Sequence, residues 1–174
     1  MKTKQLVFTA LLLAMCIVFQ SMKGISVYLT GAAVNALLVM ATLAAGTSSG
    51  VIIAVLTPVI AYFMGQTPIL QLMPIMVFVI MLGNLTLVLL ASRGKKEKLI
   101  AWLALGAMLK AVVLWLLVWY GVLPLFGAAV PEKMVGGVKT SFSITQFITA
   151  AIGCVIAFAT HTRIKHWYFV EQKN

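Results

Sequence analysis

The chain has 174 residues, of which 63% are hydrophobic and only 9% are charged. Soluble domains contain about a quarter charged residues, so this composition excludes a soluble globular domain and indicates an integral membrane protein. The 13 Lys and Arg residues outnumber the 3 Asp and Glu residues and give a formal net charge of +10. Because the basic residues lie between apolar segments rather than in one stripe, they favour cytoplasmic loops over a nucleic-acid interface.

Six apolar segments are long enough to cross a membrane as helices, which takes about 20 residues each. They are residues 5–21, 27–45, 49–65, 70–91, 99–122 and 142–162. Each segment is a continuous apolar run, without the alternation that a membrane β-strand requires. The sequence therefore predicts an all-α membrane protein with one domain over residues 1–174, built as a compact bundle of six transmembrane helices.

The distribution of basic residues predicts that both termini lie in the cytoplasm. With six spans, the connections and termini expected inside contain Lys2, Lys4, Arg93, Lys95, Lys96, Lys98, Arg163, Lys165 and Lys173. Those expected outside contain Lys23, Lys133 and Lys139. The basic hairpin at residues 93–98 is the strongest single orienting signal.

The first apolar segment has some features of a signal peptide, but we expect it to be a retained helix. Met15 is too large for the small residue that precedes a lipoprotein cleavage cysteine, and no small-x-small site follows the run. Ala10 and Ala14 are four residues apart and share one face of this helix, where small side chains let another helix approach closely. Packing within the bundle is the alternative reading of that pair.

Polar side chains inside the spans are informative because an unpaired polar group in hydrocarbon is costly. Lys110 lies near the middle of the fifth span, and no acidic residue lies in any span. If Lys110 snorkels to the interface or pairs with backbone carbonyls, its role is structural. The functional alternative is a counter-charge for an anionic ligand. Asn35, Gln71 and Asn84 are further amides within spans, and each could instead bond to a neighbouring helix.

Polar residues also gather where the outer ends of the helices are expected. Gln146 lies near the outer end of the sixth span, and Lys139 and Thr140 precede this span, where helix N–H groups attract anions. The outer connections 21–31 and 123–141 contain Gly and Pro and are candidate lids or plain connectors. Together with the intramembrane amides, these features predict a polar cavity that opens to the outside.

The sequence gives no support for an enzyme. It offers no intramembrane carboxylate, no nucleophile–base pair and no cluster of metal ligands. Cys16 and Cys154 lie far apart inside apolar segments and are interpreted as buried thiols. No catalytic residue, cofactor or metal site is therefore expected.

Several stretches follow the pattern of a known family. Ala10-Leu-Leu-Leu-Ala14 matches an AxxxA motif in the first helix, and residues 30–35 and 50–58 are also similar to members of that family. The small size, the basic inner side and the short N-terminus extend the similarity over nearly the whole chain. The chain resembles the substrate-binding S components of energy-coupling factor (ECF) transporters.

This resemblance implies a transport mechanism in the bacterial plasma membrane. An S component captures a vitamin or similar micronutrient in an outward-facing pocket. It then docks on a membrane coupling subunit driven by two cytoplasmic ATPases, and toppling of the S component carries the ligand inward. Ala10 and Ala14 would form the docking face. The pocket, which the family builds mainly from its later helices and outer loops, would include Gln71, Lys110, Lys139, Thr140 and Gln146.

The identity of the substrate is only weakly indicated. Lys110 and Lys139, with no acids nearby, slightly favour an anionic ligand such as pantothenate, lipoate, biotin or a folate-like compound. A cation such as thiamine would favour a carboxylate or an aromatic cage. The alternatives are a membrane scaffold or assembly protein without a ligand, and a stand-alone secondary transporter, although no intramembrane acid or internal repeat supports the latter.

Overall fold

The computed structural model describes residues 1–22, 26–65, 67–94 and 98–163. Within these ranges the chain folds into helices and contains no strand, which confirms the expected all-α fold. Some of the basic residues used to predict the orientation lie outside the described residues, namely Lys23, Lys95, Lys96, Lys165 and Lys173.

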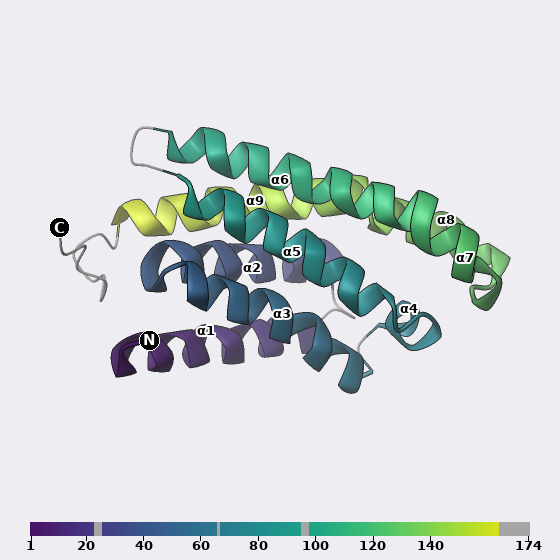
Figure 1. Ribbon diagram of the computed structural model, residues 1–174, viewed down its shortest axis with the longest axis horizontal. Coiled ribbons are helices and arrows are strands. Elements are labelled where there is room, and N and C mark those ends of the chain that lie inside the picture. The colour runs from purple at the N-terminus through teal and green to yellow at the C-terminus, as the bar shows by residue number, and fades with distance from the viewer. Residues whose placement is uncertain (23–25, 66, 95–97, 164–174) are drawn as a thin grey trace.

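Six longer helices form the body of the bundle: α1 (Thr3–Ser21), α2 (Val27–Met40), α3 (Thr47–Phe63), α5 (Met76–Ser92), α6 (Leu99–Leu116) and α9 (Ile144–Arg163). Shorter elements are α4 (Pro68–Leu72), α7 (Leu123–Phe126), α8 (Glu132–Ser141) and the 3₁₀ turn η3 (Gly127–Ala129). Two π-helical segments, η1 (Ala41–Ala45) and η2 (Leu117–Val122), continue α2 and α6. In Figure 1 the longer helices run side by side, and α4, α7 and α8 lie at the opposite end from the start of α1.

Among the described residues, four helical stretches are long and apolar enough to cross a membrane. They are Thr3–Ser21, Val27–Ala45, Leu99–Ala129 and Glu132–Arg163. Helices α3 and α5 are also apolar but have 17 residues each, which gives a length of about 25 Å against a hydrocarbon core about 30 Å thick. The chain is thus a membrane protein by composition and helix length, and its six spans stay a prediction.

Helix α1 lies at the edge of the bundle and packs mainly against α2 and α3 (Figure 1). Its N-terminal half is fastened by polar contacts, because Thr9 Oγ1 donates to Ser49 Oγ at 2.7 Å and Gln5 Nε2 donates to the Ala45 carbonyl. Ala10 and Ala14 are exposed on the face that points away from these contacts. One side of α1 is therefore free of packing within the described residues of this chain.

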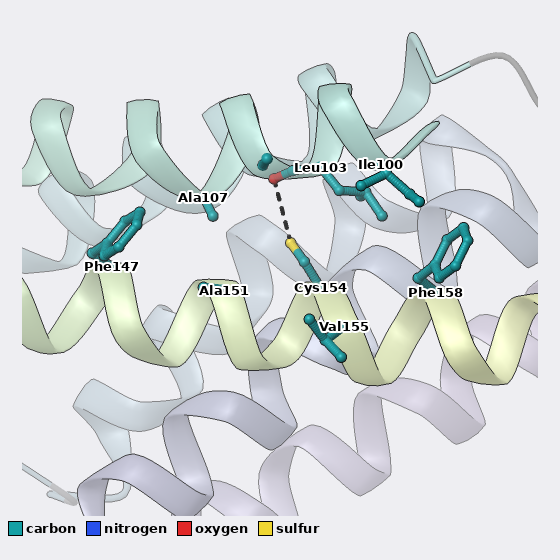
Figure 2. Close-up of a pocket in the computed structure, with 9 residues that line it drawn as sticks. Ile100, Leu103, Ala107, Phe147, Ala151, Cys154, Val155 and Phe158 are labelled. Carbon is teal, nitrogen blue, oxygen red and sulfur yellow. Dashed lines mark hydrogen bonds between the residues drawn. The ribbon is translucent and has the colours of Figure 1, made fainter. Parts of the chain in front are cut away.

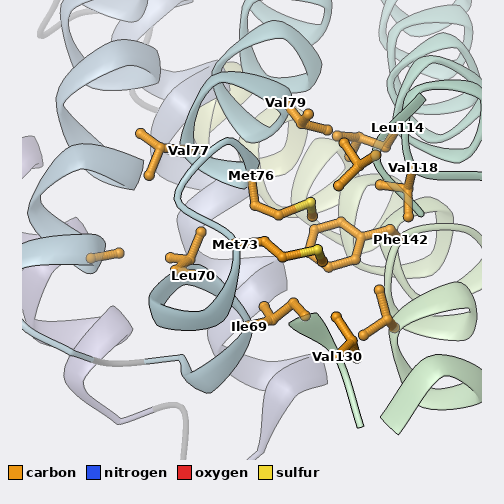
Figure 3. Packing of buried hydrophobic residues seen from close by; sticks show 13 residues of the cluster. Ile69, Leu70, Met73, Met76, Val77, Val79, Leu114, Val118, Val130 and Phe142 are labelled. Carbon is orange, nitrogen blue, oxygen red and sulfur yellow. The ribbon is translucent and has the colours of Figure 1, made fainter. Parts of the chain in front are cut away.

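The predicted span 70–91 is divided into two helices. Pro74 has no N–H group and disfavours a helical conformation at the residue before it, and Met73 accordingly has φ −133° and ψ 84°. Helix α4 ends there and α5 begins two residues after Pro74. Figure 3 shows that this break brings Met73 and Met76 against Phe142, in an apolar cluster that closes one end of the bundle.

The connection 123–141, expected to be a lid or a plain connector, is largely helical. Helix α8 is amphipathic: Val138 is buried, Met134 packs against the same apolar cluster, and Lys133, Gly136 and Gly137 are exposed. Glycine is unfavourable inside a helix, so burial of this apolar face is what stabilises α8. The segment covers the end of the bundle where α4 also lies (Figure 1).

Helices α2 and α9 cross at very short range because Gly153 has no side chain. A Cβ atom at Gly153 would lie 2.6 Å from Asn35 Cβ and 2.8 Å from the Ala32 carbonyl oxygen. Both distances are below van der Waals contact, and the second neighbour is backbone that cannot move aside. Close packing at this point fixes the position of Asn35 on α2.

We therefore expect Gly153→Ala to reduce the free energy of unfolding by about 1–3 kcal/mol, the typical cost of overpacking. Denaturation of the purified protein in detergent would measure this change. Gly136→Ala is the matched control, because a Cβ there meets no described atom within 4 Å and alanine favours the helix. Equal stability of the two variants would contradict the close crossing.

Candidate ligand-binding cavity

The bundle contains a cavity of about 490 Å³. Its lining residues come from α1, α2, α3, α5, α6, α8 and α9 and from the segment around α4. Small-molecule sites have volumes of about 300–1,000 Å³ and combine apolar walls with a few polar groups. The cavity is therefore of the right size and makeup for a compound of a few hundred daltons.

A buried lysine forms the polar centre of this cavity. Lys110 is only 3% exposed, and its Nζ donates to Asn35 Oδ1 at 2.5 Å and to Asn84 Oδ1 at 2.8 Å. These three side chains come from α6, α2 and α5, and all of them line the cavity. Three intramembrane polar residues that the sequence analysis treated separately are therefore one hydrogen-bonded group.

Further hydrogen bonds orient the two amides. Asn35 Nδ2 donates to Thr149 Oγ1 on α9, and Asn84 Nδ2 donates to the Ala54 carbonyl on α3, both at 3.4 Å. Because each amide nitrogen is engaged as a donor, each amide oxygen is left to face the Lys110 ammonium. The network thus joins five helices around one positive charge.

The charged side chains among the described lining residues of the cavity are all positive. Asn35 and Asn84 are neutral, so they solvate the ammonium of Lys110 without cancelling its charge. Lys133 on α8 also lines the cavity, and none of the described lining residues is Asp or Glu. A site with this composition attracts an anion and repels a cation.

The other predicted binding residues divide into two groups. Gln146 lines the cavity, beside Thr145 and Thr149 on the same helix. Gln71 does not line it: this side chain is exposed, and its Nε2 donates to the Tyr62 carbonyl at 2.6 Å. That contact ties α4 to the end of α3.

Two further predicted binding residues, Lys139 and Thr140, also lie outside the cavity lining. Lys139 Nζ lies 4.3 Å from the ring centroid of Trp119, a cation–π contact. Thr140 is exposed, and its hydroxyl donates to the Gly136 carbonyl at 3.1 Å. Their proximity to α9 in sequence does not bring either side chain into the cavity.

Several lining residues were missed by the sequence analysis, above all Gln20 and Lys133. Gln20 follows Leu12 and Cys16 at helical spacing on the buried face of α1, and this spacing was the available signal. Lys133 was counted only as a loop charge. Thr67, which also lines the cavity, gave no signal because short hydroxyl side chains are common at helix ends.

A second, apolar groove of about 330 Å³ lies between α6 and α9. Figure 2 shows Ile100, Phe147 and Phe158 around it, with the Cys154 thiol donating to the Leu103 carbonyl at 3.6 Å. This groove lacks the polar groups that orient a water-soluble ligand. The described residues also contain no group of three or more His, Cys, Asp or Glu side chains suited to a metal ion.

Comparisons with known proteins identify the family. A family model described as "ECF transporter, substrate-specific component" matches residues 4–163. No curated protein and no solved structure gives a significant match. The match covers nearly the whole chain and confirms the resemblance seen in the sequence. The chain belongs to the family of substrate-specific components of ECF transporters.

Proposed function

We propose that this chain captures an anionic vitamin or related micronutrient in the cavity around Lys110, as the S component of an ECF importer. Family membership supports a substrate-binding subunit of an ECF transporter, which works with an energy-coupling module of membrane and ATPase subunits. The observation that carries the proposal is the buried ammonium of Lys110, held by two neutral amide oxygens in the wall of the cavity.

Burying a charge is costly because a low-dielectric surrounding stabilises ions poorly. Neutral acceptors reduce this cost, but an anion reduces it much more, since the Coulomb attraction is strong where water is excluded. Lys133 adds a second positive charge to the lining. An anionic ligand would thus bring a negative charge into a cavity lined by Lys110 and Lys133, a feature that a scaffold protein without a ligand does not need.

The orientation that we propose has six spans with both termini in the cytoplasm. The basic residues Arg93 and Lys98 flank the connection between α5 and α6, at the same end of the bundle as the start of α1 (Figure 1). The positive-inside tendency favours that end as cytoplasmic. The end with α4 and α8, which contribute lining residues to the cavity, would then face the outside.

Helix α1 is the proposed contact with the coupling subunit. Ala10 and Ala14 are exposed, while Thr9 and Gln5 fasten the helix to the bundle from another side. Small residues on an exposed helix face favour close association with a second membrane helix. The role implied is binding and delivery, with no catalytic step and no cofactor.

Replacing Lys110 tests the ligand site. We expect Lys110→Met to weaken binding of the anionic substrate about 10–100-fold, the range for a lost hydrogen bond to a charged group. Lys139→Met removes the same charge at a residue outside the cavity lining and should leave affinity within about twofold. Calorimetry or a thermal-shift titration would measure both. Unchanged affinity in Lys110→Met would show that this lysine is structural.

Blocking the face of α1 tests docking. Ala14→Trp should leave substrate affinity unchanged and abolish uptake by cells or proteoliposomes that contain the coupling module, because a large ring prevents close helix contact. Met15→Trp is the control, since Met15 is also exposed and lies about 100° further round the helix. Loss of binding in Ala14→Trp, or equal loss of uptake in both variants, would contradict the assignment.

A further inference from the structure

Two residues that line the cavity each contain a buried side-chain oxygen that has no hydrogen-bond partner among the described residues. Within the described residues, the buried side-chain nitrogen and oxygen atoms that lack a partner are Gln20 Oε1 and Thr67 Oγ1. Both residues line the 490 Å³ cavity. Buried polar groups in folded proteins are nearly always hydrogen-bonded, so these two oxygen atoms are candidates to bond with a ligand in this cavity.

Of the two oxygen atoms, that of Gln20 gives the stronger evidence for a contact with a ligand. Its side chain is only 5% exposed, and it lies at the C-terminal end of α1 on the buried face. The terminal amide of glutamine turns about a soft torsion, so the oxygen can meet a group inside the cavity without movement of the backbone. Thr67 precedes the first residue of α4 and supplies a hydroxyl that can accept or donate.

Gln20 and Thr67 occupy other positions along their elements than the lysine centre does. Lys110 lies in the middle of α6, whereas Gln20 and Thr67 lie at helix ends. The first region is cationic and suits an anion; the second is neutral and offers acceptor oxygens, which suit an N–H or O–H donor. A ligand that satisfied both would have two chemically different ends.

We infer that Gln20 and Thr67 bind a neutral hydrogen-bond donor of the same ligand, so that the substrate is an anion that also carries an N–H or O–H group away from its charge. This inference rests on the proposed function and narrows its substrate class. Hydrogen-bonding sites discriminate strongly against an analogue that lacks the matching group, because the buried partner is then left unsatisfied.

The probes that separate donor-bearing from donor-free anions are biotin, pantothenate and lipoate. Biotin and lipoate both carry a carboxylate chain that ends in a sulfur-containing ring, but only biotin has ureido N–H groups there. Pantothenate carries hydroxyl and amide donors. We expect the wild-type full-length protein in detergent to bind biotin or pantothenate at least about tenfold more tightly than lipoate.

The decisive variant is Gln20→Leu, with Gln5→Leu as its control on the same helix. Gln20→Leu should weaken the donor-bearing acid about tenfold without lowering the melting temperature of the ligand-free protein, because it replaces an amide whose buried oxygen has no partner among the described residues with an apolar side chain. Gln5→Leu removes the contact with Ala45 and should lower the melting temperature without changing affinity. Thr67→Val is a second cavity variant and should act like Gln20→Leu.

The outcomes separate this inference from the proposed function. Equal affinity for lipoate and the donor-bearing acids, or a lower melting temperature with unchanged affinity in Gln20→Leu, overturns the inference alone. If the wild type instead retains a metabolite from an extract of the expression host, an N–H or O–H group away from its anionic group supports the inference, and its absence overturns it. A wild type that binds none of the acids and nothing from the extract overturns both proposals.

Discussion

The hydrogen bonds from the Lys110 ammonium to Asn35 and Asn84 are the constraint around which this bundle is organised. A cation in the middle of a membrane protein is tolerated only where polar groups replace its hydration. Here the replacements come from two other helices, and their own donors engage Thr149 and the Ala54 carbonyl. The close crossing of α2 and α9 at Gly153 and the packing of α5 against α6 accompany the contacts that place Asn35 and Asn84 beside Lys110.

The first helix contributes both to the proposed docking face and to the lining of the cavity. Its exposed face carries Ala10 and Ala14, and its buried face ends in Gln20 at the cavity wall. Polar contacts anchor the N-terminal half of α1 through Thr9 and Gln5, whereas the polar atom at its other end has no partner among the described residues. The cavity residue Gln20 and the proposed docking face therefore belong to the same helix.

Much of the fold could be predicted from the sequence because long apolar runs have few solutions in a membrane. The division of the stretch 70–91 depended on the backbone restriction imposed by Pro74, and the folding of α8 depended on the apolar cluster that buries Val138. The site was harder to predict. Lys110 and Asn35 are 75 residues apart, so their contact follows from tertiary packing alone. By contrast, Gln71 was an equally suitable candidate for the binding site in the sequence, but its side chain donates a hydrogen bond to the carbonyl of Tyr62, nine residues away.

In the proposed function, the cavity around Lys110 holds an anionic small molecule. Native mass spectrometry of the wild-type protein, purified from a host grown in rich medium and then incubated with a metabolite extract, tests it most directly. We expect a bound species of a few hundred daltons that carries an acidic group. A bound cation without an acidic group, or a protein that stays empty after incubation with the extract, would contradict it.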